Sequence, residues 1–145
     1  MSKETSKDNA TFSDLFSLLN RALELEYSLI IPYPCLASTI HDDEVRKLVF
    51  QLGTASVHHA DIVANAITQL GGQPSWGFSP FPEDDDILNI FQIQLEKEKK
   101  ALELHKQSAN LVPSGSLAKS LAALADEERH HIEIVNKIIS KLARP

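Results

Sequence analysis

Apolar residues recur every three or four positions over four long stretches of the chain, and this spacing predicts four α-helices. Glycine and proline, which interrupt helices, are few and mostly lie between these stretches. The predicted helices run from Thr11 or Ser13 to about Thr39, from near Asp42 to Gly71, from Glu83 to about Val112, and from Ser114 or Ser116 to about Leu142. The sequence therefore predicts an all-α protein.

The connections between these stretches predict how the helices are arranged. The first and last connections are short, so each joins two antiparallel helices. The middle connection, residues 71–82, has about a dozen residues, which at about 3.3 Å each can span roughly 40 Å, the length of a long helix. We expect it to cross the length of an up-down-down-up four-helix bundle, held against the helices by Trp76, Phe78 and Phe81.

Polar residues interrupt the apolar stripe of each predicted helix, near its middle. Several lie roughly 14 residues, or about 21 Å, from the start of their helices, so we expect them in one layer of the bundle. The inward polar positions are Glu26, Ser56, His59, Glu98, His105, Glu128 and His131. Glu127 and His130 fall on an adjacent, wetter face of the last helix.

The inward residues form a repeat. Glu26 precedes His59 by 33 residues, and Glu98 precedes His131 by the same 33 residues. A four-helix bundle that binds two metal ions uses one Glu on each of two helices and Glu-x-x-His on each of the other two. Glu128 and His131 supply one Glu-x-x-His pair, whereas Ser56 occupies the glutamate position before His59.

These motifs resemble those of the ferritin-like superfamily, particularly its bacterioferritin and rubrerythrin branch of carboxylate-bridged di-iron proteins. The resemblance covers residues 12–142. It rests on Glu26 followed by Tyr33, on Glu98 followed by Ala101, on His59 and Asp61, and on the Glu-x-x-His-x-acid motif of Glu128, His131 and Glu133. The resemblance implies a ferritin-like fold, and the length of the chain fits a single domain, spanning residues 11–145.

The resemblance also implies a set of metal ligands. Glu26 and Glu98 would be terminal carboxylates, His59 and His131 terminal imidazoles, and Glu128 a bridging carboxylate. Ser56 would leave an open position. Tyr33 and His105 are expected beside the ligands, although a core hydrogen bond explains His105 equally well. One or two iron ions are the expected cofactor, with manganese or zinc as alternatives.

Two functions follow from the resemblance and the incomplete motif. One is a rubrerythrin-like oxidoreductase that acts on peroxide, dioxygen or ferrous iron and receives electrons from an unidentified donor. The alternative is a catalytically silent bundle with a relic metal site, used as a binding or dimerisation module, in which buried His and Glu pair in the apo protein. A homodimer is expected in either case.

Composition and local breaks refine this picture. The net charge of −6 argues against nucleic acid or anionic membrane as a partner, and the absence of a long apolar run predicts a cytoplasmic protein. Residues 1–10 are polar and predict a disordered tail. Cys35, the one cysteine, is expected in the core. Pro32 and Pro34 predict a kink beyond Glu26.

Overall fold

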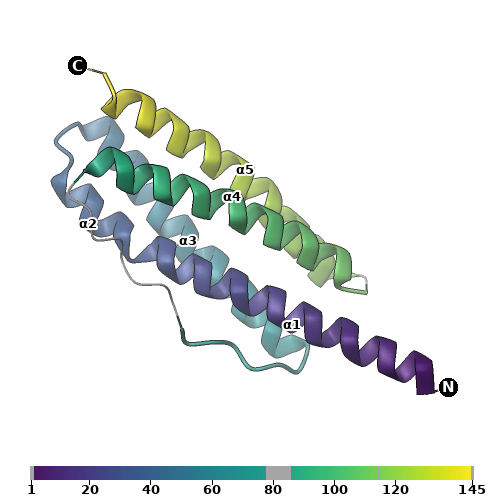
Figure 1. Cartoon of the computed structure of the whole chain (residues 1–145). Helices are drawn as coiled ribbons and strands as arrows, with labels where there is room; N and C mark the ends of the chain where they lie inside the picture. The colour runs from purple at the N-terminus through teal and green to yellow at the C-terminus, as the bar shows by residue number, and fades with distance from the viewer. Residues whose placement is uncertain (1, 78–85, 114, 145) are drawn as a thin grey trace.

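The computed structural model describes the backbone of residues 2–77, 86–113 and 115–144, and side chains from residue 13 onward. Within these residues the structure has four long helices and one short helix (Figure 1). They are α1 (Ser2–Ile30), α2 (Pro32–Thr39), α3 (Asp43–Gln69), α4 (Ile87–Leu111) and α5 (Ser116–Leu142). No strand occurs among the described residues, so the predicted all-α four-helix bundle is confirmed.

The helix ends follow local sequence. Asp42 caps α3 by accepting a hydrogen bond from the Val45 amide, and Asp86 caps α4 in the same way at Leu88. The first helix, α1, begins at Ser2, whereas the sequence predicts a disordered tail over residues 1–10. Neither glycine nor proline occurs before Pro32 to interrupt that helix.

The predicted kink is present as a break between α1 and α2 at Ile31. Pro32 has no amide hydrogen for the Ser28 carbonyl one turn earlier. The Lys97 ammonium from α4 donates to that carbonyl instead, at 3.3 Å. Beyond the break, Tyr33 lies in the core, where it is 1% exposed.

Contacts between charged and polar side chains define the helix directions. Lys141, near the end of α5, lies 3.0 Å from Glu44, near the start of α3, so these helices are antiparallel. Gln94 of α4 contacts Leu29 of α1, and His105, three turns later, contacts Glu26, so α4 and α1 are also antiparallel. The short connection between α4 and α5 makes those two helices antiparallel as well. Together these directions give the predicted up-down-down-up order (Figure 1).

The start of the crossover is held by hydrogen bonds to α1. The Asn20 side chain accepts from the Ser75 amide at 2.7 Å and donates to the Gln73 carbonyl at 3.3 Å, while the Ser75 hydroxyl donates to Glu24 at 2.6 Å. Trp76 is 87% exposed, so the prediction that it anchors the crossover is wrong. The predicted anchors Phe78 and Phe81 lie outside the described residues.

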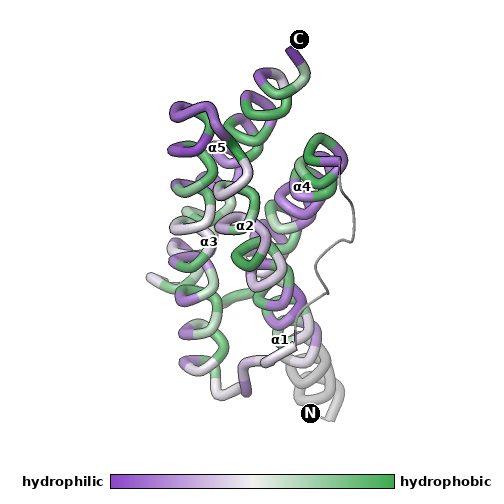
Figure 2. The backbone as a smooth tube through the Cα atoms, turned by 90° about the vertical axis from the view of Figure 1, so that its left-hand side faces the viewer, coloured by the Kyte–Doolittle hydropathy of each residue, from purple (hydrophilic) through white to green (hydrophobic). Residues whose placement is uncertain are grey.

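The core is two apolar clusters, one toward each end of the bundle. The first contains Leu29, Leu52 and Phe91, and the second contains Leu23, Val63 and Leu124. Figure 2 shows hydrophobic and hydrophilic positions alternating along the helices, as expected when each helix has one buried side. A layer of buried polar residues lies between the two clusters along every long helix.

Two further sequence predictions meet the structure at the surface. Cys35 is exposed rather than buried, because the short α2 buries Pro32, Tyr33, Leu36 and Ala37 and turns its opposite side to solvent. None of the helices in the described residues combines the length and apolar character needed to cross a membrane.

Candidate metal centre

Four helices each place acidic or imidazole side chains in the middle layer of the bundle. Because these residues share a stripe with the core leucines and valines, burying the stripe buries them too. At most 5% of any of these residues is exposed: Glu26 on α1, His59 on α3, Glu98 and His105 on α4, and Glu128 and His131 on α5. The predicted layer of inward polar residues is thus present.

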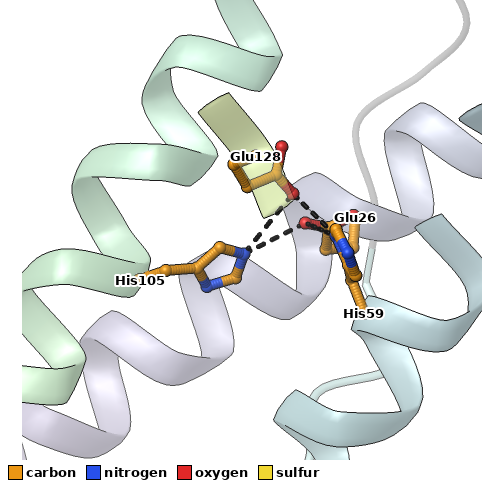
Figure 3. A group of neighbouring side chains, drawn as sticks. All are labelled: Glu26, His59, His105 and Glu128. Atoms are coloured by element: carbon orange, nitrogen blue, oxygen red, sulfur yellow. Dashed lines mark hydrogen bonds and ion pairs between the residues drawn. The ribbon is translucent and has the colours of Figure 1, made fainter. Parts of the chain in front are cut away.

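One group of donors joins all four long helices (Figure 3). The His59 Nδ1 lies 2.8 Å from Glu128 Oε1 and 3.7 Å from Glu26 Oε1. The His105 Nε2 lies 3.1 Å from the same Glu26 oxygen and 3.7 Å from the same Glu128 oxygen. These four donor atoms lie within 4.8 Å of one another, close enough to surround a single ion. We call this set the α1–α3 group.

A second group contains Glu98, Glu128 and His131, and we call it the α4–α5 group. The His131 Nδ1 lies 3.6 Å from Glu98 Oε2 and 3.7 Å from Glu128 Oε2. Glu98 Oε1 points the other way and accepts a hydrogen bond of 2.9 Å from the Tyr33 hydroxyl. This group therefore has three donors at longer separations than the shortest contacts of the α1–α3 group.

Glu128 belongs to both groups through different oxygens. Its Oε1 faces His59 and His105, and its Oε2 faces His131. A carboxylate that presents one oxygen to each of two donor sets has the arrangement needed to bridge two ions. The rings of His59 and His131 stack beside it, with centroids 4.7 Å apart.

Burial and neighbouring charges shift the pKa values of the α1–α3 group. Burial lowers the pKa of His59, but hydrogen bonds with Glu128 and Glu26 outweigh burial and raise it to about 11. The same balance raises the pKa of His105 to about 9. Burial raises the pKa of Glu26, but hydrogen bonds from His105 and His59 outweigh it and leave that pKa lowered. Two imidazolium ions and a carboxylate therefore pair here in the protein alone near pH 7.

The α4–α5 group behaves differently. Burial raises the pKa of Glu98 to about 8, and its neighbour Glu128 adds to the increase. Burial also raises the pKa of Tyr33 well above its usual value. Glu98 therefore holds a proton near pH 7 while Glu26 does not. The two terminal carboxylates of the repeat have opposite electrostatic environments.

The donor set fits a metal ion. Within the described residues, Glu26 Oε2, Glu98 Oε2, Glu128 Oε2 and His131 Nδ1 are buried and lack a hydrogen-bond partner. Buried polar atoms are normally paired, so several such atoms in one layer need an explanation. Imidazole and carboxylate donors suit iron, manganese and zinc. Three of these atoms, Glu98 Oε2, Glu128 Oε2 and His131 Nδ1, meet in the α4–α5 group, where an ion would satisfy them.

The ferritin-like domain family matches residues 16–144, which is most of the chain. The chain belongs to the ferritin-like family. No curated protein matches the sequence.

Solved structures share this ferritin-like fold at low sequence identity. A ferritin-like, diiron-carboxylate protein from Bacillus anthracis strain Ames has a TM-score of 0.80 and 20% identity, covering 89% of this chain and 97% of that one. The dodecameric thioferritin of Bacteroides fragilis, a bacterioferritin-related protein, has a TM-score of 0.76 and 18% identity, covering 99% and 96%. Rhodobacter capsulatus bacterioferritin, described with a metal-free dinuclear site and heme iron, has a TM-score of 0.70 and 21% identity, covering 88% and 84%.

In this ferritin-like protein the predicted ligand residues come together. The residues beside them are placed partly as predicted and partly differently. Tyr33 bonds to Glu98 as a residue beside the ligands would. His105 lies among the donors themselves rather than behind them. The hydroxyl of Ser56 is buried and has no hydrogen-bond partner among the described residues. Whether Ser56 leaves an open metal position stays a prediction.

Sequence reasoning missed two polar residues near the centre. Glu127 is 52% exposed, as expected for the wetter face of α5, yet its Oε2 lies 2.6 Å from His59 Nε2. Gln94 is fully buried and donates to the Leu29 carbonyl at 3.4 Å. Glu127 directly precedes Glu128, and Gln94 lies one turn before Glu98. Closeness in sequence to a predicted ligand was therefore the signal that could have found them.

Proposed function

We propose that this ferritin-like protein is a metalloprotein that acts as an oxidoreductase on peroxide, dioxygen or ferrous iron. The observation that supports it most is the convergence of six buried ionisable residues on two donor groups that share Glu128. Burying carboxylates and imidazoles costs free energy unless they are paired or bind metal. Packing of an inert core would favour apolar residues at these positions.

Each residue has a defined part in this proposal. Glu26, His59, Glu98, Glu128 and His131 hold the metal, which is iron or manganese and supplies the redox chemistry when bound. Glu127 accepts a hydrogen bond from His59 Nε2, which directs Nδ1 toward the centre. Tyr33 holds Glu98 in place through its hydroxyl. The apolar clusters on both sides restrict water around the donors.

Metal analysis of tag-free protein after anaerobic ferrous loading tests the proposal. We expect at least about one tightly bound ion per chain, and we expect the reduced protein to consume peroxide. The Glu98→Ala variant should lose much of this activity, whereas Glu103→Ala, which changes an exposed residue of the same helix, should not. Fewer than about 0.2 metal equivalents after loading would contradict the proposal.

The silent bundle is the second candidate, and the ion pairs of the α1–α3 group favour it. His59 lies between two carboxylates, at 2.8 Å from Glu128 and 2.6 Å from Glu127, so part of the layer is paired without an ion. A relic site of this kind would bind no iron, manganese or zinc. The same metal analysis distinguishes the two functions.

We also propose that the protein is a homodimer. Three large apolar side chains of the α1–α3 region are exposed, namely Ile31, Phe50 and Val57. Phe50 and Val57 line one apolar groove with Ile30 and Pro34, which a second copy of the chain would cover. Light scattering should give twice the chain mass, with Phe50→Glu monomeric and Ala122→Glu, at an exposed position of α5, unchanged. A monomeric parent protein would contradict the dimer.

A further inference from the structure

His105 has a place in the centre that the two-metal helix pattern does not explain. That pattern takes one glutamate from the third long helix and no histidine. Here α4 supplies Glu98 and also His105, two turns later, with its ring fully buried. The His105 Nε2 points into the α1–α3 group, at 3.1 Å from Glu26 Oε1 (Figure 3).

The position of His105 matters because the α1–α3 group lacks a carboxylate. Ser56 stands where the pattern has the second bridging glutamate. Without His105, an ion in this group would have Glu26, His59 and one oxygen of Glu128. With His105 there are four donors, from four helices, and each atom is within 4.8 Å of the others.

The separations of these donors match a small coordination sphere. A tetrahedral ion with bonds of about 2.0 Å holds its donors about 3.3 Å apart. The contacts of His59 and His105 with the Glu26 and Glu128 oxygens range from 2.8 to 3.7 Å. Once an ion has displaced the imidazole protons, the two carboxylates and two neutral imidazoles carry two negative charges, which balance one divalent ion in a buried site.

We propose that His105 is a metal ligand through Nε2 and makes the α1–α3 group a four-donor site for one divalent ion. This site fills before the α4–α5 group. The inference rests on the proposed function, since it requires that the centre binds metal, and it adds a ligand and an order of filling.

The order of filling follows from the donors of the second group. The α4–α5 group offers three residues, and one oxygen of Glu98 is already bonded to Tyr33. Glu128 is shared, so an ion in the α1–α3 group draws part of its charge. A second ion therefore binds more weakly than the first.

Zinc titration of the full chain, followed by long-range ¹H–¹⁵N correlation of the histidine rings, tests this order directly. Zinc is diamagnetic and takes both imidazole and carboxylate donors. The structure turns Nδ1 of His59 and Nε2 of His105 toward the first site, and Nδ1 of His131 toward the second. The first zinc equivalent should change the His59 Nδ1 and His105 Nε2 signals, and His131 should respond only to further zinc.

A variant gives an independent measurement. Loss of a residue that only hydrogen-bonds to a ligand lowers metal affinity about 10- to 100-fold. His105→Gln should lower the affinity for the first zinc ion by more than this. His130→Gln, at an exposed histidine of α5, is the matched control and should leave affinity unchanged. If His105→Gln does not fold, the ring signals of the unsubstituted protein decide.

The outcomes separate this inference from the proposed function. If zinc binds while the His105 Nε2 signal is unchanged, or if His131 responds first, the inference is overturned and metal binding stands. A loss of only about 10- to 100-fold in His105→Gln also overturns it. If neither zinc nor ferrous iron binds, both the inference and the proposed function are overturned.

Discussion

The half of the repeat with the more complete sequence motif has the longer histidine–carboxylate contacts in the structure. In the sequence, the half with Glu98 and His131 is complete, and the half with Glu26 and His59 lacks a glutamate at Ser56. In the structure, His59 has close carboxylate contacts on both ring nitrogens, at 2.8 and 2.6 Å. The nearest carboxylate oxygens to His131 Nδ1 are at 3.6 and 3.7 Å.

A motif along one helix therefore does not reveal how many donor side chains the other helices add between them. The half that is incomplete along α3 has His105 of α4 among its donor atoms, and Glu127 of α5 contacts His59 from outside the group. A site between four helices takes ligands from every helix that faces it, so a loss on one helix can be offset by another. The repeat therefore describes two related but inequivalent donor groups.

Removing the residue that both halves share should have the largest effect. We expect Glu128→Ala to reduce zinc binding below about 0.2 equivalents. Each donor group loses one oxygen, and the centre loses a negative charge that would balance the ion. Glu133→Ala, at an exposed carboxylate of the same helix, is the control and should bind normally. Isothermal titration calorimetry measures both. Equal losses in the two variants would mean that α5 does not supply the centre through Glu128.

Restoring the missing glutamate should make the halves alike. Ser56 is one turn before His59 on α3, so Ser56→Glu adds a carboxylate on the same helix face. Stoichiometry should rise from about one zinc ion to about two, because the new charge offsets a second ion. The apo variant should be less stable, since a buried carboxylate is added without a partner.

Ser56→Gln separates charge from size in that experiment. The glutamine has nearly the volume of glutamate but carries no charge, so it should keep the parent stoichiometry. If Ser56→Glu and Ser56→Gln bind the same number of ions as the parent protein, Ser56 does not face the centre.

A smaller effect is expected from the carboxylate behind His59. Glu127→Ala removes the acceptor for His59 Nε2 without removing a ligand, and should weaken zinc binding about 10- to 100-fold. His130→Ala, three residues later on the exposed side of α5, should leave affinity within error of the parent. If the two variants behave alike, the contact of Glu127 with His59 does not support the centre.

Helix periodicity predicted the layer well but not its outer members. Glu26, Glu98 and Glu128 lie on apolar stripes, and burying a stripe fixes which polar residues enter the core. The break at Pro32 was also predictable, because proline removes a backbone donor wherever it falls in a helix. The helix directions followed from the lengths of the connections.

Other features depend on contacts between helices, which one sequence does not encode locally. Glu127 lies on the exposed side of α5. It contacts His59, at 2.6 Å, because α3 packs against α5. Cys35 is an apolar residue of a short helix that buries its other side, and Trp76 lies in a loop held by hydrogen bonds of its neighbours. Residue type alone predicted the wrong environment for both.

The smallest expected effect is on the stability of the protein without metal, and it should depend on pH. Glu98 has a pKa of about 8 in the folded protein against a usual value of 4.5. Below pH 4.5 the carboxyl is protonated in both folded and unfolded chains and contributes nothing to the difference. Between these values the unfolded chain ionises and the folded chain does not, so this residue destabilises the fold increasingly as pH rises toward 8.

Glu98→Gln removes that penalty while keeping an acceptor for the Tyr33 hydroxyl. The metal-stripped variant should therefore be more stable than the parent by about 1–3 kcal/mol near pH 8, with the difference vanishing toward pH 4. Urea unfolding at several pH values measures it, with Glu103→Gln, an exposed carboxyl of α4, as the control. No such gain is expected from Glu26→Gln, because hydrogen bonds from His105 and His59 lower the pKa of Glu26 and that carboxylate stabilises the fold. A stability gain in Glu26→Gln but not in Glu98→Gln would reverse the electrostatic roles of the two halves.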